Sequence, residues 1–263
     1  MNPSRLRNII KRLYRNPISE LCKTQREKIT CFLLTKLYSK LPNVMMGEEN
    51  IFTSWSNIAF IHEKAVLEIG SYNFFSPETK LAVYEEGQLK LGNSCILWKG
   101  SIGSRCKITI GDMFLAAENF VIEDSEGHPV DPEWRKRQVN WLVERMRPQL
   151  KGFTPLTGEE RAFMDRYPFA AMPPMKGVNV DEIVIGNNVW LGRNVTIRKG
   201  ARIGDNCVIA TGAVVTREIP PNHVAGGIPA RPLKKLDVQN FQQTMKRIRS
   251  EFPDYQGDPQ CEW

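Results

Sequence analysis

A six-residue pattern repeats from Ile185 onward. An aliphatic residue stands at each of positions 185, 191, 197, 203, 209 and 215, without a slip. The residue four places after it is Val, Val, Ala, Cys or Ala. A period of six fits neither the 3.6-residue period of a helix nor the alternation of a simple strand. The repeat therefore indicates short strands joined by sharp corners.

The same pattern predicts where the side chains lie. Each aliphatic residue enters a common interior, the small residue fits a crowded corner, and Gly or Asn tolerates the positive φ of a tight turn. Weaker copies begin at Ile69, Leu91, Ile102 and Ile110, each followed by Gly. Leu91 and Ile102 stand one position closer together than two full repeats would place them, so a bulge or loop absorbs the difference. Stacked coils leave open ends, and helical segments at 1–40 and 237–252 are the expected caps.

Four further motifs add to the period. They are Ile185-Gly-Asn-Asn-Val-Trp-Leu-Gly192, Ala210-Thr-Gly-Ala-Val-Val-Thr216, Pro220-Pro221 and Gly226-Gly-Ile-Pro-Ala-Arg231. With them, residues 60–236 resemble the hexapeptide-repeat acyltransferases, in particular the maltose/galactoside and polysaccharide O-acetyltransferase branch. The resemblance implies a mainly β fold, a left-handed parallel β-helix, and a homotrimer with active sites between subunits. The left hand rests on the resemblance alone, since parallel crossovers are generally right-handed.

The chain divides into three predicted segments. A basic helical segment occupies 1–59, the β-helix acyltransferase domain occupies 60–236 with an insertion at 129–182, and a C-terminal helix and tail occupy 237–263. The net charge of +7 is local, because residues 1–40 carry ten basic and two acidic side chains and the rest of the chain sums to −1. Apolar residues recur at helical spacing among those charges.

Two interpretations of this basic segment stay open. It packs as an amphipathic helix on its own protein, or it contacts an anionic membrane surface or acidic polymer. Nucleic-acid binding would rest on this charge alone, and no nucleic-acid partner is expected because no recognisable module is present.

The sequence also indicates the cellular compartment in which the protein is expected. No apolar run reaches the ~20 residues that cross a bilayer, and no secretory signal pattern is present, so a cytoplasmic protein is expected, with membrane association left open. Six cysteines form no C-x-x-C pair and no zinc-ligand spacing with histidine, so they are interpreted as packing thiols and no metal is expected.

Three histidines are present, and His128 is the candidate base. It lies in Val121-Ile-Glu-Asp-Ser-Glu-Gly-His-Pro129, directly after the weaker repeats. Histidine titrates near neutral pH and can take a proton from an attacking hydroxyl. In the resembled family the histidine at this place is the general base. Neither His62 nor His223 matches that place. Among the nearby acids, Asp124 is the first candidate and Glu126 the second for orienting the ring, although solvated loop acids explain either equally well.

The resemblance also places the acyl donor, acetyl-CoA. Its pantetheine and thioester would follow Trp190, Gly192 and Arg193, with Thr211 and Gly212 one turn further. Backbone N–H groups at a coil corner can stabilise the thioester oxyanion. The candidates for the phosphates and adenine of the coenzyme are Arg231 and Lys234, with Thr216 and Arg217 on the coil below. A solvated cluster of C-terminal charges is the alternative for this last group.

The chain departs from the resembled enzymes between His128 and Ile185. Asp131-Pro132 predicts a helix that ends before Pro148, and the capping box of Thr157 and Glu160 predicts a second that stops before Pro168. Two roles stay open for this insertion: shaping the acceptor cleft with Trp134, Trp141 or Tyr167, or packing against the coil or a neighbouring subunit.

The leading hypothesis is an O-acetyltransferase that moves acetyl from acetyl-CoA to a sugar hydroxyl. The expected acceptor is a carbohydrate, such as a bacterial surface polysaccharide, a capsule or a glycan precursor. Direct transfer is expected because no Ser or Cys stands in a recognisable nucleophile motif. The alternatives are an N-acyltransferase on a nucleotide-linked amino sugar or an antibiotic, and a non-catalytic β-helix scaffold.

Overall fold

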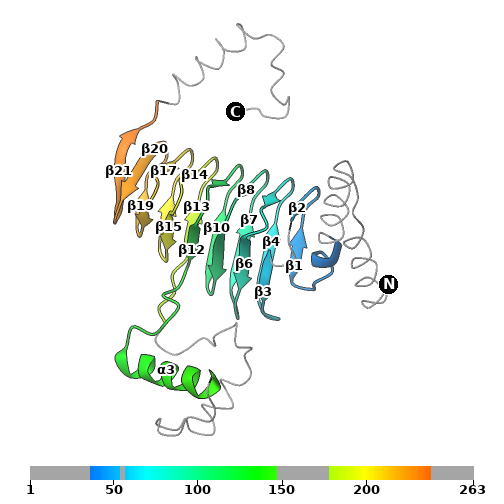
Figure 1. The fold of residues 1–263 in the computed structure, drawn as a ribbon. Helices are drawn as coiled ribbons and strands as arrows, with labels where there is room; N and C mark the ends of the chain where they lie inside the picture. The colour runs from blue at the N-terminus through cyan, green and yellow to red at the C-terminus, as the bar shows by residue number, and fades with distance from the viewer. Residues whose placement is uncertain (1–35, 54–56, 147–177, 238–263) are drawn as a thin grey trace, which may run out of the picture.

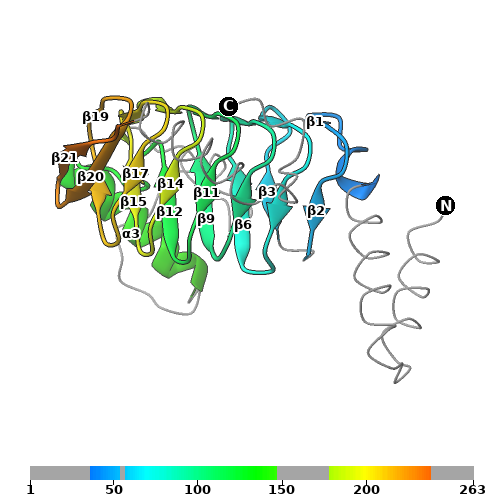
Figure 2. The same ribbon diagram turned by 90° about the horizontal axis from the view of Figure 1, so that it is seen from above.

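The computed structural model describes residues 36–53, 57–146 and 178–237. Within these residues the chain winds as a solenoid of short strands, and successive coils lie side by side from β1 at one end to β21 at the other (Figures 1 and 2). Successive coils add their strands to the same three sheets, and neighbouring strands in each sheet are parallel apart from a final hairpin. The short strands expected from the six-residue period, and the mainly β, parallel β-helix architecture implied by the resemblance, are confirmed.

Each sheet forms one face of the solenoid. The first contains β1 (Val44–Met46), β4 (Val66–Ile69), β7 (Gln88–Leu91), β10 (Lys107–Ile110), β13 (Ile183–Ile185), β16 (Arg202–Ile203) and β19 (Glu218–Ile219). The second contains β2 (Ile51–Phe52), β5 (Phe74–Phe75), β8 (Ile96–Leu97), β11 (Leu115–Ala116), β14 (Trp190–Leu191), β17 (Val208–Ile209), β20 (His223–Gly227) and β21 (Ala230–Lys235). The third contains β3 (Ile58–Ile61), β6 (Thr79–Val83), β9 (Gly100–Ser104), β12 (Phe120–Glu123), β15 (Thr196–Arg198) and β18 (Val214–Val215).

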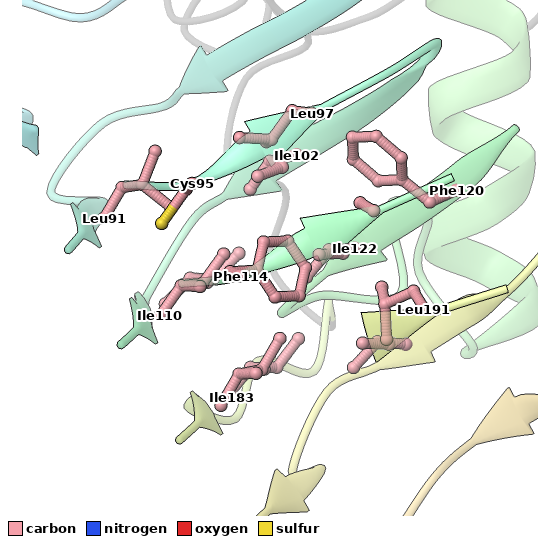
Figure 3. Close-up of a cluster of buried hydrophobic side chains, with 14 of the residues drawn as sticks. Leu91, Cys95, Leu97, Ile102, Ile110, Phe114, Phe120, Ile122, Ile183 and Leu191 are labelled. Atoms are coloured by element: carbon pink, nitrogen blue, oxygen red, sulfur yellow. The ribbon is translucent and has the colours of Figure 1, made fainter. Parts of the chain in front are cut away.

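The core runs through the middle of the coil. All six aliphatic positions of the regular repeat, from Ile185 to Val215, are at most 2% exposed. The small residues two places before the last five of them are buried as well, as predicted. In the earlier coils Phe114 and Phe120 fill the interior beside Leu97 and Ile122 (Figure 3). Here the small residue Ala116 stands at the aliphatic position, and the two aromatic rings occupy positions that smaller residues take in the later coils.

The corners confirm why Asn and Gly recur. The residues three places after the aliphatic position have positive φ; they are Asn188, Asn194, Gly200, Asn206 and Gly212. The glycine directly after the aliphatic residue serves a different purpose. A Cβ on Gly186 would overlap Oδ1 of Asp205, so only glycine lets the two coils approach so closely here.

The coil starts before the boundary expected at residue 60. Strands β1 and β2 lie within 44–52 and pair in parallel with β4 and β5. Met46, Phe52 and Ile58 already follow the six-residue spacing; Met46 is followed by Gly47, whereas Phe52 and Ile58 are not followed by glycine. Tyr38 is buried and sets its ring edge against Phe52, with the ring centroids 5.1 Å apart, so the chain before β1 contacts the first coil. The rest of the predicted N-terminal helix and cap lies outside the described residues.

A hairpin that the sequence did not predict follows the last coil. Strand β21 pairs antiparallel with β20 and so covers the open edge of the second sheet. The turn contains the Ile228-Pro229 motif, whose peptide bond is cis. The C-terminal helix expected at 237–252 lies outside the described residues, apart from Asp237.

The insertion separates two neighbouring coils. Leu115 pairs with Trp190 across the whole insertion, whereas Trp190 pairs with Val208 on the directly following turn of the chain. Inside the insertion, α3 (Pro132–Met146) confirms the first predicted helix, and Asp131 Oδ1 caps it by accepting the Trp134 N–H at 3.0 Å. The second predicted helix lies outside the described residues. Among the described helices, none is long and apolar enough to cross a membrane.

Candidate active site

The two ends of the insertion are bound to each other where they leave and re-enter the coil. Ser125 and Val180 form an antiparallel bridge. The Glu126 N–H donates to the Asn179 carbonyl at 3.1 Å, and the Asp181 N–H donates to the Asp124 carbonyl at 3.0 Å. We call residues 124–128 and 179–181 the neck. It gives the candidate base a fixed support even though 129–182 is a long excursion.

Two basic side chains on the next coil bind the neck and the residue before it through ion pairs and a hydrogen bond. Arg198, the last residue of β15, pairs with Glu123 at 3.0 Å and donates to the Ser125 carbonyl at 3.2 Å. Lys199 pairs with Glu126 at 3.5 Å. Neither residue is among the site residues predicted from the sequence. Their signal was a pair of basic residues, Arg198-Lys199, beginning at the repeat position where Gly or Ala often stands.

His128 extends from the neck as an exposed residue. Gly127 precedes it with φ +72°, a conformation that turns the chain sharply and that glycine adopts readily. The Nδ1 atom of His128 lies 2.9 Å from Oε1 of Gln138, on α3. Gln138 is only 2% exposed. The ring is therefore held by an amide from the insertion, and no signal in the sequence pointed to it.

Asp124 lies inside the coil, where its carboxylate bonds groups other than the imidazole. It is fully buried, and it accepts the Arg105 N–H at 2.7 Å, the Cys106 N–H at 2.9 Å and the Ser104 hydroxyl at 2.8 Å. Burial raises the pKa of the Asp124 carboxyl, although these three hydrogen bonds oppose the rise. These contacts give Asp124 a structural role, as the anchor of the corner between β9 and β10.

Glu126 makes its contacts within the neck. Besides the pair with Lys199, Glu126 Oε2 accepts from Asn179 Nδ2 at 3.3 Å. The structure thus joins this acid to the returning strand of the insertion. The prediction that Asp124 or Glu126 orients the base stays a prediction, and Gln138 is the residue that the geometry places against His128.

Most of the predicted donor-binding residues lie together on one edge of the solenoid, where the second sheet turns into the third. A Cβ on Gly192 would lie 2.7 Å from the Thr211 nitrogen, so the two coils touch there. The Gly212 N–H donates to the Arg193 carbonyl at 2.8 Å. Nothing lies within 4 Å of where a Cβ on Gly212 would stand. We call residues 190–193 and 211–212 the donor edge.

Trp190 belongs to this edge and also to the outer face of the second sheet. It is 49% exposed, and it pairs in register with Leu115 on one side and Val208 on the other. Arg193 pairs with Glu118 at 2.8 Å. A hydrogen bond from its own backbone and then the bond from Arg193 lower the pKa of the Glu118 carboxyl. Both side chains are largely exposed, so this pair contributes little to stability.

The other predicted donor residues lie elsewhere. Thr216 and Arg217 follow β18, at the corner where the third sheet turns into the first, and this is also the corner from which the neck departs. Arg231 and Lys234 are exposed on β21, and the Arg231 guanidinium donates to the Ala230 carbonyl at 2.9 Å. Lys234 pairs in register with Val224, which continues the row of Trp190 and Val208.

Within one chain, the base and the donor edge therefore occupy different corners of the coil. The four residues of β12 separate them, a length of about 13 Å at ~3.3 Å per residue. The remaining histidines are bound locally: His223 Nδ1 lies 2.8 Å from the Pro221 carbonyl, and His62 Nδ1 accepts the Lys64 N–H at 3.2 Å. In the ranges that the structure describes, no three His, Cys, Asp or Glu side chains are grouped to hold a metal ion.

Comparisons with known proteins agree with the repeat and the coil. The family described as "Bacterial transferase hexapeptide (six repeats)" matches residues 182–217. The galactoside O-acetyltransferase of Escherichia coli K12 is 35% identical over 130 residues, 49% of this chain and 45% of the relative. That of Lactococcus lactis is 43% identical over 134 residues, 51% of this chain and 46% of the relative. Residues 182–217 of this chain thus carry the hexapeptide repeat of bacterial transferases.

The comparisons also have limits of extent. The chain spans about half the length of these curated relatives. Among solved structures, a single-site variant of AntD, an N-acyltransferase from Bacillus cereus in complex with dTDP and coenzyme A, aligns with a TM-score of 0.50. The identity is 9%, and the alignment covers 82% of this chain and 96% of that one. This similarity shows a shared fold.

Proposed function

We propose that this hexapeptide-repeat transferase is an acetyl-CoA-dependent O-acetyltransferase that acts on a sugar hydroxyl. The observation that carries the proposal is the exposed imidazole of His128, fixed at the neck of a coil that also bears the family repeat. The names of the two galactoside O-acetyltransferases support the acceptor class.

The residues are suited to direct transfer. His128 takes the proton of the acceptor hydroxyl as that oxygen bonds to the thioester carbonyl carbon. Backbone N–H groups of a coil corner stabilise the oxyanion that forms. As the tetrahedral intermediate collapses, the C–S bond breaks and the thiolate leaves with the proton that His128 held. The products are the acetyl ester and free coenzyme A.

The donor edge is suited to the pantetheine of acetyl-CoA. Gly192 lets the coil of Thr211 pack closely against it, and the space beside Gly212 is open, so an extended chain can lie close to the peptide groups near Gly212. Trp190 adds an exposed aromatic plane, and Lys234 continues the same row with a positive charge. These features favour the donor assignment predicted from the sequence.

Helix α3 supports a carbohydrate acceptor beside the base. The Arg137 guanidinium stacks over the Trp134 ring at 5.2 Å. Trp134 stands about one helical turn before Arg137 and Gln138, so the three residues lie on the same side of α3. An aromatic plane with an arginine is suited to a sugar ring that carries an acidic group. We therefore infer an acidic surface polysaccharide, capsule or glycan precursor as the acceptor.

We infer that the working unit is a homotrimer in which neighbouring subunits complete each site. The separation of His128 from the donor edge within one chain supports this inference. So does a row of exposed apolar side chains along the second sheet, formed by Ile51, Ile96, Leu115 and Trp190, each 37–49% exposed. Contiguous apolar surface of this kind typically marks an association site. Trp190 is both in this row and on the donor edge, so the donor would bind at the subunit boundary.

Two assays test the activity. The first measures free thiol released from acetyl-CoA by wild type and His128→Ala over hydroxy sugars, amino sugars and acidic oligosaccharides, with mass analysis of the products. A histidine-dependent ester supports the proposal. An amide product would instead favour the N-acyltransferase alternative, whose fold this chain shares. The second assay is calorimetry: if acetyl-CoA does not bind and no acceptor turns over, the scaffold alternative becomes the better explanation.

Complementation tests the shared site. His128→Ala removes the base, and Thr211→Trp fills the donor edge beside Gly192. Each variant alone is expected to be inactive. In randomly mixed trimers about a quarter of the shared sites would combine an intact base with an intact donor edge, so activity should recover to that level. No recovery on co-expression would place base and donor edge in one subunit.

The location of the protein is also a proposal. Acetyl-CoA use and the cysteine pattern favour the cytoplasm, and the basic residues 1–40 favour contact with an anionic membrane surface or the acidic acceptor. Sedimentation with vesicles containing anionic lipid, compared between the full chain and a chain from which residues 1–35 are deleted, separates membrane contact from simple packing.

A further inference from the structure

We propose that Gln138 is a positioning residue that fixes the tautomer of His128, with the proton on Nδ1 and the basic lone pair on Nε2. The observation is the 2.9 Å contact between His128 Nδ1 and Gln138 Oε1. This inference rests on the proposed role of His128 as the base, and it assigns a part in the site to the insertion.

The chemistry of the two groups determines the tautomer. An amide oxygen only accepts hydrogen bonds, so a ring nitrogen that contacts it must carry a proton. The other ring nitrogen of a neutral imidazole then has the free lone pair. Only that nitrogen can take a proton from an attacking hydroxyl. The hydrogen bond thus prepares His128 for use as a base.

Burial makes the amide a rigid support. Gln138 is 2% exposed on α3, whereas His128 at the other end of the hydrogen bond is exposed. A buried amide keeps its orientation because turning it would leave polar atoms without suitable partners. The helix itself is tied back to the loop after His128, since Arg135 donates to the Val130 carbonyl at 2.8 Å. Helix and base therefore form one unit.

A neutral amide is also suited to a base better than a carboxylate would be. A carboxylate at this distance would favour the charged imidazolium, which has no lone pair for a proton. Gln138 orients the ring without adding charge. The acids nearest in sequence have other partners, since Asp124 bonds the backbone at 105–106 and Glu126 pairs with Lys199.

Nitrogen NMR tests the tautomer without any need for activity. Long-range correlations between ring protons and ring nitrogens distinguish a protonated from an unprotonated nitrogen, and the chain has only three histidines to assign. His128→Ala identifies the His128 signals. At pH 8, where histidine is ordinarily neutral, we expect wild-type His128 to carry its proton on Nδ1. A proton on Nε2 would overturn the proposal.

Variants at position 138 test the cause. Gln138→Met keeps the size and removes the acceptor, and Gln138→Glu keeps an acceptor oxygen. Lys136→Ala, at an exposed position of α3, is the matched control. We expect Gln138→Met to move the proton toward Nε2 and to lower kcat by roughly ten- to a hundred-fold, with an unchanged KM for acetyl-CoA. Gln138→Glu should keep the Nδ1 proton, and Lys136→Ala should change nothing.

The outcomes separate the two levels of the hypothesis. An unchanged tautomer in Gln138→Met would overturn the positioning role, even in an active enzyme. A tautomer that shifts as expected in a protein that acetylates no acceptor would support the positioning role and count against the proposed function. Far-UV circular dichroism and the melting temperature of each variant show whether a loss of kcat reflects unfolding, and the tautomer measured by nitrogen NMR separates positioning from a purely structural cause.

Discussion

Replacing Asp124 separates a structural role from a catalytic one. Asp124 lies four places before the base, where a residue that orients His128 would be sought, yet its carboxylate bonds the corner at 104–106. Asp124→Ala removes the acceptor of two backbone N–H groups and one hydroxyl. Asp124→Asn keeps the size but turns one oxygen into an N–H donor that faces other donors.

The magnitude follows from burial. Asp124 is 0% exposed, so water does not readily replace the lost acceptor. A buried polar group left without a partner costs about 1–3 kcal/mol, so Asp124→Ala, which leaves two N–H groups, should lower the free energy of unfolding by about 3–5 kcal/mol. Asp124→Asn keeps some of the bonds and should cost about 1–3 kcal/mol. For a domain of this size, a loss of about 3–5 kcal/mol lowers the melting temperature by roughly 6–20 °C.

Denaturant unfolding and kcat, measured on the same samples at a temperature where every variant is folded, decide between the roles. If Asp124 is structural, both variants lose stability while kcat stays within a few-fold of wild type. The matched control is Glu126→Gln, whose partly exposed pair with Lys199 should change stability by less than about 1 kcal/mol. A hundred-fold loss of kcat in Asp124→Asn with unchanged stability would refute the structural assignment.

The pH dependence has a definite sign. Because burial raises the pKa of Asp124, the folded state holds this proton at pH values where the unfolded state has released it. The contribution of Asp124 to stability is therefore greatest below its ordinary pKa and declines as pH rises through the raised value. Asp124→Asn lacks this titration. The stability difference between wild type and Asp124→Asn should consequently shrink from pH 3.5 toward neutrality, whereas a constant difference would contradict the raised pKa.

Three further predictions concern packing and access. Gly192→Ala sets a Cβ against the Thr211 nitrogen, so it should cost about 1–3 kcal/mol and weaken acetyl-CoA binding measured by calorimetry. Phe120→Ala empties the interior of an early coil and should lower the free energy of unfolding by about 3–5 kcal/mol, measured in denaturant. Burial raises the pKa of Cys95 to about 12 and also raises that of Cys207, so mass mapping after alkylation at pH 8 should find both unmodified until the protein unfolds.

The solenoid could be predicted because its core repeats in the sequence. The spacing of the aliphatic residues from Ile185 to Val215 indicates their burial by itself, and every one is buried. Before residue 60 the signal is weaker, because Met46 and Phe52 are not aliphatic and glycine follows only the first of these two, so the boundary predicted at residue 60 lies too late. The closing hairpin was not predicted, because Ile228-Pro229 was interpreted as part of a family motif and not as a turn.

The candidate site was only partly predictable. His128 and the donor edge followed from motifs, because local sequence determines which residue types stand at a corner. The partner of His128 could not be predicted in this way. Gln138 contacts the base because the insertion folds back at α3, and the number of residues between the two does not reveal how the chain folds there. Asp124 shows the converse difficulty. An acid near a histidine in sequence suggests a shared function, but alternation along β12 continues into Asp124 and turns its side chain inward.

The separation of the base from the donor edge gives a reason for the insertion to depart after β12. In a regular coil each corner is fixed by the coils above and below, which leaves no freedom to adjust a catalytic side chain. A loop that departs after β12 escapes this constraint, but it then needs its own support. The neck supplies that support through Arg198 and Lys199, and α3 supplies it through Gln138. In the proposed trimer, the coil would present the donor to one neighbour while the insertion would hold the base toward another.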